Sequence, residues 1–381
     1  MTKSKVALIK CDTYDNKLVN NAVREGINLL GGIDKFVNKG EKIVIKPNVL
    51  IGSKPEKCIC THPAVFRAVS IVLKEADVIL SYGDSSGFGR CLTNMKMGGF
   101  KSVADELGII IADFDKGKPV IHREALLNTS FFVANGVLES DGLVSVSKLK
   151  THGLTRFTGA VKNQFGCIPG IRKGQLHIHM ADPYDFATML VDLNTFIKPR
   201  LYIMDGIMAM EGNGPRNGNP KKLGVLLFSD DPIALDAVAC KIIHLNPSDV
   251  PTSQPGEKAG LGTYHLQNIE ILGNNIESFV DENFDVVRKP PIPTSSGRVR
   301  TFLRNQLSPK PVIDVMICNN CGTCVKQCPV NPKAVNWFGE DKSRPPTHKY
   351  DRCIRCYCCQ ELCPEEAINV KETILSRVIF R

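Results

Sequence analysis

The chain has 381 residues, 43% of them hydrophobic, and its 48 basic and 39 acidic residues give a formal charge of +9. This length fits one large domain plus a small one, and no apolar run approaches the ~18 residues that a membrane-spanning helix needs. The N-terminal apolar stretch Val6–Ile9 is too short for a secretory signal, so it predicts a first β-strand in a cytoplasmic protein.

Up to about residue 275, short continuous apolar runs alternate with amphipathic stretches. The predicted strands are Val6–Ile9, Lys42–Ile45, Val78–Ser81, Ile109–Asp113, Leu143–Val146, Leu201–Met204, Gly224–Phe228 and Ile269–Leu272. The predicted helices include Asn16–Leu30, Pro63–Glu75, Asp185–Ile197 and Pro232–Ile243. Strands that are apolar throughout and separated by helices are typical of a parallel sheet covered on both faces. Residues 1–287 are therefore predicted to form an α/β domain with a mostly parallel sheet.

Four polar segments follow predicted strands, namely Lys46–Asn48, Gly83–Gly89, Ser147–His152 and Asp205–Gly206. The carboxyl ends of parallel strands share one rim, and ligands bind there. We therefore expect these four segments, which are far apart in the sequence, to converge on one crevice.

The candidate site residues are Lys46, Asp84, Lys148, Lys150, His152, Lys162 and Asn163. Lys148 and Lys150 alternate, so an extended chain would place both on one side, where with Lys46 they could hold a carboxylate or phosphate. His152 or Asp84 could move protons. Solvated lysines and a surface histidine are the simpler alternatives. Gly83–Gly89 resembles a phosphate-cradling turn but lacks the established glycine order and a Walker lysine.

Two glycine-rich segments accompany these residues. Gly159–Gly170 contains Lys162 and Asn163 and is expected to end a helical stretch in a turn. Met210–Arg216 is too rich in Gly and Pro for regular structure, which predicts a loop that approaches an anion, forms a lid or simply connects. His177 and His179 would share a face if their segment were extended, a spacing that suits a divalent metal, although no third ligand lies nearby in the sequence.

Residues 288–311 interrupt this pattern with six basic residues, five prolines and no acidic residue. Such a composition predicts a semi-rigid, basic linker. Residues 312–381 are then predicted to form a small α+β domain, whose tail Thr373–Arg381 packs back as a strand or a helix.

Eight of the fifteen cysteines form two identical C-x2-C-x2-C-x3-C-P runs, at Cys318–Pro329 and Cys353–Pro364. This spacing is typical of bacterial-type 4Fe–4S sites, in which the fourth cysteine of each run ligates the other cluster. The sequence therefore predicts two 4Fe–4S clusters. Their ligands would be Cys318, Cys321, Cys324 and Cys363 for cluster one, and Cys353, Cys356, Cys359 and Cys328 for cluster two. Zinc or a disulfide framework is the alternative, but zinc sites usually pair two C-x2-C halves.

The two runs differ in the segment after their last cysteine. Cys328–Val335 is two residues longer than the corresponding Cys363–Ile368, so the two clusters should have different environments and potentials. Cys358, next to Cys359, is an inert neighbour or, less simply, an alternative ligand. The cysteines outside the module are Cys11, Cys58, Cys60, Cys91, Cys167 and Cys240, all expected to be free thiols. Exposed free thiols together with two clusters suggest a reducing cytosol and an anaerobic or microaerobic prokaryote.

The clusters also change the charge. At about −2 each they would lower the formal charge to roughly +5, and only 7% of the residues are aromatic. Without aromatic side chains interleaved among basic ones, no nucleic-acid surface is predicted. The expected partners are a redox protein, as donor or acceptor, and a small anionic substrate.

The motifs together resemble the domain-of-unknown-function 362 family, in the architecture where that domain is fused to a C-terminal two-cluster ferredoxin module. The residues that carry the likeness are Lys46–Asn48, Thr61–Pro63, Gly83–Ser85, Lys148–His152, Gly159–Asn163, Pro169–Gly170, Asp205–Gly206 and Glu211–Pro215. The large domain is also distantly similar to the N-terminal domain of nickel-pincer lactate racemases. That similarity implies a carboxylate or cofactor site, with the identity of any additional cofactor left open.

The leading interpretation is an iron–sulfur electron-transfer protein or oxidoreductase, whose ferredoxin module relays electrons to a partner or to a ligand at the rim of the α/β domain. A second possibility is a carrier whose large domain only docks or binds. The alternative of a different class is a redox-neutral enzyme, such as a metal-assisted racemase or lyase acting on a carboxylate, in which the clusters are structural or sensory.

Overall fold

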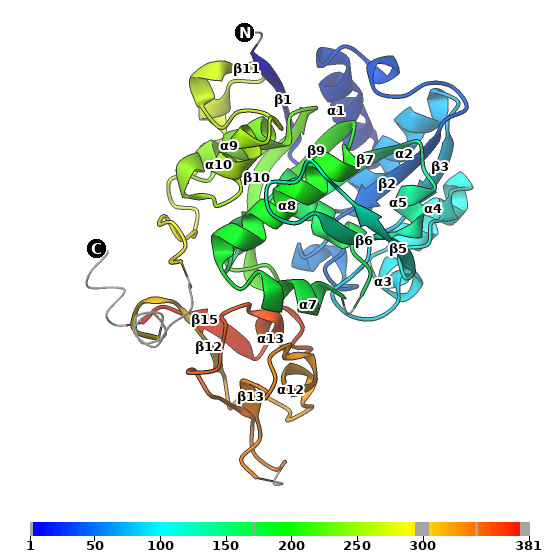
Figure 1. Cartoon of the computed structure of the whole chain (residues 1–381). Helices are drawn as coiled ribbons and strands as arrows, with labels where there is room; N and C mark the ends of the chain where they lie inside the picture. Colours follow the sequence, from blue (N-terminus) through cyan, green and yellow to red (C-terminus); the bar gives the residue numbers. More distant parts are fainter. Residues whose placement is uncertain (1–2, 171, 294–304, 340–341, 374–381) are drawn as a thin grey trace.

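The computed structural model describes residues 3–170, 172–293, 305–339 and 342–373 (Figure 1). A large α/β domain occupies the upper part of Figure 1, and a smaller unit built from residue 310 onward lies below it. We call this smaller unit, residues 310–373, the cysteine module.

A single large sheet runs through the α/β domain, in the order β11-β1-β10-β9-β7-β2-β3-β4, with β8 paired to β7. Its strands are β1 (Ser4–Lys10), β2 (Lys42–Pro47), β3 (Ile79–Tyr82), β4 (Ile110–Ile111), β7 (Gly142–His152), β8 (Arg156–Thr158), β9 (Leu201–Asn213), β10 (Asn217–Ser229) and β11 (Ile269–Gly273). A separate hairpin joins β5 (Gly117–Ile121) and β6 (Ser130–Ala134). Only β10 and β8 pair antiparallel within the large sheet, so the predicted mostly parallel sheet is confirmed.

Helices cover both faces of this sheet. They are α1 (Asn16–Leu29), α2 (Pro63–Glu75), α3 (Cys91–Met97), α4 (Phe100–Leu107), α5 (Asn135–Leu138), α6 (Ala160–Asn163), α7 (Arg172–His179), α8 (Pro183–Ile197), α9 (Pro232–Ile242) and α10 (Ser253–Lys258). Strand β1 shows why both faces are covered, because Val6 and Leu8 join the core beneath α9 while Ala7 and Ile9 join the core beneath α1, α2 and α8. A strand buried on both faces reads as a continuous apolar run.

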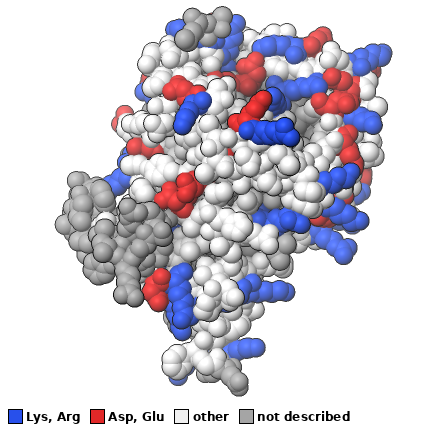
Figure 2. Space-filling view, in the orientation of Figure 1, with Lys and Arg blue, Asp and Glu red and all other residues white. Residues whose placement is uncertain are grey.

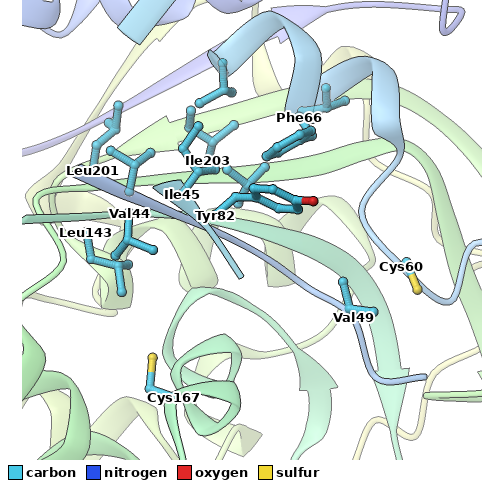
Figure 3. Packing of buried hydrophobic residues seen from close by; sticks show 14 of the residues in the cluster. Val44, Ile45, Val49, Cys60, Phe66, Tyr82, Leu143, Cys167, Leu201 and Ile203 are labelled. Atoms are coloured by element: carbon cyan, nitrogen blue, oxygen red, sulfur yellow. The ribbon is translucent and has the colours of Figure 1, made fainter. Parts of the chain in front are cut away.

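The centre of the sheet is packed with aliphatic and aromatic side chains (Figure 3). Val44 and Ile45 of β2 lie among Leu143 of β7 and Ile203 of β9, and Phe66 of α2 lies against Tyr82 of β3 with ring centroids 5.3 Å apart. This packing fixes the carboxyl ends of β2, β3, β7 and β9 relative to one another, and the polar segments that follow these strands inherit those positions.

Three predicted strands continue beyond their expected ends. Strand β7 runs on to His152, and β9 and β10 extend as a long hairpin through Met210–Asn213 and Asn217. The prediction that Met210–Arg216 cannot form regular structure is therefore wrong. Gly212 takes a φ of +74° and Gly218 lies against the Glu211 carbonyl, so the glycines are accommodated within a paired hairpin, and only Gly214–Arg216 turn.

The cysteine module consists of β12 (Lys310–Ile313), α12 (Thr323–Gln327), β13 (Val335–Asn336), β14 (Thr347–His348), α13 (Cys358–Glu361) and β15 (Ile368–Lys371). Strand β12 pairs with β15, and β13 pairs with β14. Because β12 begins at Lys310, regular structure starts inside the segment 288–311 that was predicted to be linker. Residues 294–304 of that segment, and the tail 374–381, lie outside the described residues.

The tip of the β9–β10 hairpin holds the module in place. Asn217 donates to the carbonyls of Glu366 and Ile368, both at 2.8 Å. Gln360 of α13 donates to the Asn213 carbonyl at 2.8 Å, and the Arg216 guanidinium reaches the carbonyls of Glu361 and Pro364. These polar contacts between the two units fix α13 against the rim of the sheet.

Two glycines in helices provide a matched test of the packing. A Cβ at Gly26 of α1 would lie 2.4 Å from the Phe228 ring, whereas one at Gly174 of α7 would meet no atom closer than 3.8 Å. We expect Gly26→Ala to lower the free energy of unfolding by about 1–3 kcal/mol through overpacking. Gly174→Ala should raise it by up to ~1 kcal/mol, because alanine favours the helix. Thermal and denaturant unfolding of both variants measure the difference, and equal effects would contradict this packing.

Candidate functional site

A cavity of about 340 Å³ lies between the rim of the sheet and the cysteine module. We call it the interface cavity. Its large-domain wall includes Asn48, Asp84, Lys150, Lys162, Asn163, Lys173 and His177, and its module wall includes Lys326, Cys328, Pro329, Lys333, Cys358 and Glu361. Figure 1 shows the corresponding arrangement of elements, with α7 directly above α12 and α13. This volume falls within the range of small-molecule sites.

The walls of the cavity carry more positive than negative charge. Five lysines line it, together with two carboxylates, Asp84 and Glu361. Both carboxylates already have partners, since Asp84 lies 2.7 Å from the Lys46 ammonium and Glu361 lies 3.0 Å from the His152 ring. The Lys162 ammonium has no hydrogen-bond or ion-pair partner among the described residues. An anion is therefore the ligand that would balance the cavity electrostatically.

Burial alters the acidity of the cavity lysines. Desolvation lowers the pKa of Lys150 to about 7 and that of Lys173 to about 8, and it also lowers the pKa of Lys162. Lys173 donates to the carbonyls of Ser85 and Ser86, and Lys150 donates to the Ile59 carbonyl. A lysine with a pKa near neutrality can both attract an anion and exchange a proton.

Lys46, Asp84 and Asn163 form a buried support beneath the cavity. Lys46 is fully buried, and besides Asp84 it donates to Asn163 at 3.1 Å. Asn163 in turn receives a hydrogen bond from Asn48 at 3.2 Å. A Cβ at Gly166 would lie 1.8 Å from Asp84, so only glycine allows this close approach.

Asp236 of α9 positions the segment that carries Lys162. Its carboxylate accepts hydrogen bonds from the Ala160 and Val161 amides at the start of α6, at 2.6 and 3.2 Å. Burial raises the pKa of Asp236 to about 7. The sequence did not predict this role, since an aspartate inside an apolar helix carries no motif.

Lys148 lies in a different cluster. Its ammonium lies 2.9 Å from both Asp205 and the Tyr14 hydroxyl, and Tyr14 stacks on His62 with ring centroids 3.6 Å apart. Neither Lys148 nor Lys46 lines the interface cavity. The prediction that Lys46, Lys148 and Lys150 hold one anion together therefore fails, because two of the three ammoniums are already paired with carboxylates.

His152 is buried rather than solvated. Its Nδ1 accepts hydrogen bonds from the Leu154 and Thr155 amides, which leaves the proton on Nε2, facing Glu361. Burial lowers the pKa of His152 to about 4, so the ring is neutral at physiological pH. His152 thus links the rim of the sheet to α13 of the cysteine module.

His177 and His179 do not share a face. They lie on helix α7 rather than on an extended segment, so their side chains point in different directions, and His177 is buried while His179 is exposed. The premise of a two-histidine metal site is therefore wrong. His177 stacks on Phe186 with ring centroids 4.5 Å apart, and its Nδ1 has no hydrogen-bond partner among the described residues. It contributes to the cavity wall instead.

The cysteines of the two runs gather within the module. A small second cavity is lined by Cys318, Cys321, Cys324 and Cys363, which combines three residues of the first run with the last of the second. Cys359 lies within electrostatic reach of Cys353, Cys356 and Cys328. The buried Nε of Arg355, beside Cys353, lacks a protein acceptor among the described residues. These arrangements fit thiolate-bound clusters, whose sulfur atoms accept hydrogen bonds.

All fifteen cysteines are free, and the seven outside the predicted ligand sets are buried. Cys358 hydrogen-bonds to Cys356 and lines the interface cavity. The expectation of exposed free thiols is wrong, so these cysteines do not indicate an anaerobic source. The basic side chains that are exposed lie among acidic ones over the large domain, and they predominate over the lower part of the face in Figure 2.

Sequence reasoning missed Lys173, Lys326, Lys333 and Glu361 as cavity residues. Lys333 had a signal, because it lies in the two-residue extension after the first cysteine run. Glu361, between two predicted ligand cysteines, and Lys173, in a polar helix, had none. No described helix is long and apolar enough to cross a membrane.

Comparison with known proteins extends these findings. The chain is 34% identical over 282 residues to the thylakoid-associated protein sll1697 of Synechocystis, an alignment that covers 74% of this chain and 87% of the relative. Residues 310–364 match the model of the 4Fe-4S dicluster domain.

Solved structures resemble the chain only loosely. The lactate racemase apoprotein of Thermoanaerobacterium thermosaccharolyticum aligns with a TM-score of 0.42 and 12% identity over 63% of this chain. A protein of Thermotoga maritima aligns with a TM-score of 0.30 and 10% identity over 56% of this chain. The chain spans little more than half of either structure, at 56% and 55%.

Residues 43–241 match the family model described as domain of unknown function DUF362. With this match and the relative above, the chain belongs to the DUF362 family, with a 4Fe-4S dicluster ferredoxin domain at its C-terminal side.

Proposed function

We propose that this protein is an iron–sulfur oxidoreductase that holds two 4Fe–4S clusters and acts on a small organic anion in the interface cavity. The observation that carries the proposal is the composition of the cavity walls. One wall presents lysines of the DUF362 domain, and the other contains Cys328 and Cys358 of the cysteine module. An anion bound there would lie next to the part of the chain that handles electrons.

Eight cysteines would hold the clusters. Cluster one would take Cys318, Cys321, Cys324 and Cys363, and cluster two would take Cys353, Cys356, Cys359 and Cys328. When bound, the clusters would supply one-electron transfer. A reducing compartment such as the cytosol would keep these thiolates and the buried free thiols intact, and a redox partner protein would exchange electrons with the module.

The lysines would bind and orient the substrate. Lys162 offers an ammonium without a partner among the described residues, Lys150 and Lys173 stand on the same wall, and Lys326 and Lys333 face them from the module. Leu50, Phe165 and Leu362 add apolar surface. An organic anion with an apolar part would match this combination better than an inorganic ion alone.

Protons would come from within the cavity. Lys150, with a pKa of about 7, is poised to give or take a proton near neutrality. Asp84 and Lys46 would hold Asn163 in place beneath the substrate, and His152 would hold Glu361 and thus α13. These roles divide the predicted site residues into one proton carrier and a set of positioning residues.

The alternative function is a redox-neutral enzyme that acts on a carboxylate. It would use the same lysines, but its turnover would not need the clusters. The two possibilities separate experimentally, because a redox-neutral reaction would proceed equally with the clusters oxidised or reduced.

Metal analysis tests the cluster assignment. Protein purified without oxygen should contain about eight irons and eight sulfides per chain, and the dithionite-reduced form should show two interacting S = ½ EPR signals. Cys321→Ser, in the exposed part of the first set, should remove or convert one signal, whereas Cys240→Ser in α9 should leave both. Stoichiometric zinc in anoxic protein would contradict the assignment.

Lys162→Gln tests the anion site. Loss of an ammonium that binds an anion removes a charge-assisted hydrogen bond of about 1.5–3 kcal/mol, so the variant should bind phosphate and succinate at least tenfold more weakly. Isothermal titration of the anoxic holoprotein measures this. Lys17→Gln, a substitution of an exposed lysine on α1, is the control. Equal binding by wild type and Lys162→Gln would exclude the cavity as the anion site.

Anion binding should also depend on pH. Lys150 and Lys173 are protonated below pKa values of about 7 and about 8 and become neutral above them. Affinity for sulfate, whose charge is constant in this range, should therefore fall about tenfold or more between pH 6 and pH 9. Lys150→Met should flatten the part of this dependence near pH 7. An affinity that rises with pH would contradict the role of these lysines.

A further inference from the structure

The two predicted cluster sites differ in the side chains that surround them. An inference from this difference rests on the proposed function, because it takes the two ligand sets to hold clusters. The set of Cys353, Cys356, Cys359 and Cys328 adjoins the interface cavity through Cys328, so we call it the inner set. The other set includes Cys321, the most exposed of the fifteen cysteines, and we call it the outer set.

Two cationic side chains contact cysteines of the inner set. Lys333 donates to the Cys328 carbonyl at 2.5 Å. Arg355, which is 2% exposed, donates to the Cys353 carbonyl at 3.2 Å and also hydrogen-bonds the Cys353 thiol. Each of these charges therefore lies against a residue that would ligate cluster two.

A ring nitrogen adds a third contact to the inner set. His348 Nε2 lies 3.5 Å from the Cys359 Sγ. The carboxylate that acts on this set, Glu361, is itself held by His152 at 3.0 Å and faces Lys162. Its charge is thus offset by neighbouring groups of the large domain.

The outer set has a different environment. Its cavity is lined by the Glu365 carboxylate and by no basic side chain among the described residues. The nearest cation, Arg216, acts on Cys363 but is shared with Glu365 and Glu366. The sulfur contact on this side comes from a neutral group, the Thr323 hydroxyl, 3.3 Å from the Cys321 Sγ.

Reduction adds a negative charge to a cluster, so nearby cations and hydrogen bonds to sulfur raise the reduction potential, whereas nearby carboxylates lower it. Burial acts in the opposite direction, since a buried cluster gains charge less readily. The inner set is the more buried one. Two cations in contact with its ligand residues oppose that burial at short range, where charge effects are strongest.

We propose that cluster two, on the inner set, has the higher reduction potential, and that Lys333 and Arg355 set this order. An electron from a one-electron donor protein that docks beside the exposed Cys321 would reach cluster one first. Cluster one would then be reoxidised as cluster two is reduced, and the electron would arrive beside the cavity. The two-residue extension that carries Lys333 thus gives the relay its direction.

Potentiometric titration followed by EPR tests this order in the anoxic holoprotein. Lys333→Gln should lower the higher of the two potentials by about tenfold in the reduction equilibrium, about 59 mV for a one-electron couple, and should move the lower potential much less. Lys333→Arg should preserve both. Lys326→Gln, which removes an exposed lysine of the nearby helix α12, is the matched control and should change neither potential comparably.

A second variant guards against misfolding. His348→Phe should lower the same potential by removing the contact to Cys359, and iron content near eight per chain confirms that each variant is loaded. The proposal is overturned if Lys333→Gln shifts the lower potential, or shifts neither while the iron content is intact. Wild-type protein with fewer than eight irons would instead defeat the proposed two-cluster function, so the two failures are distinguishable.

Discussion

Lysine side chains buried without carboxylate partners are costly, and the interface cavity contains them. A buried ammonium lowers its own pKa or acquires a partner, and both responses occur in this protein. Lys46 and Lys148 have carboxylates within 2.7 and 2.9 Å, whereas Lys150 and Lys173 have lowered pKa values. The surplus charge is the constraint that the rest of the site satisfies, and it accounts for an anionic ligand without reference to any relative.

The cavity exists because the cysteine module is docked on the rim. Its contacts with the β9–β10 hairpin are mostly hydrogen bonds to backbone carbonyls, which fix position without demanding a large apolar interface. The His152–Glu361 pair adds a buried link between strand β7 and helix α13. Through these contacts, the elements that carry the predicted cluster ligands and the elements that carry the lysines share one enclosed space.

Much of this architecture could be predicted from the sequence. The sheet, its main helices and the convergence of Lys46, Asp84 and Asn163 follow from apolar runs and from the rule that parallel strands end at one rim. Side-chain partners could not be predicted, because Asp205 and Asp84 are far from their lysines in the sequence. Local segments misled where they depended on pairing: Met210–Asn213 is a strand only because β10 pairs with it. His177 and His179 separate only because their segment is a helix.

The central claim is that a substrate anion binds within magnetic reach of cluster two. Pulsed electron–nuclear double resonance on the reduced holoprotein with bound phosphate tests it most directly, because the phosphorus nucleus reports its distance from the paramagnetic cluster. We predict a phosphorus hyperfine coupling in the wild-type protein that disappears in Lys162→Gln at the same phosphate concentration. Tight phosphate binding without any such coupling would place the anion elsewhere and contradict the account.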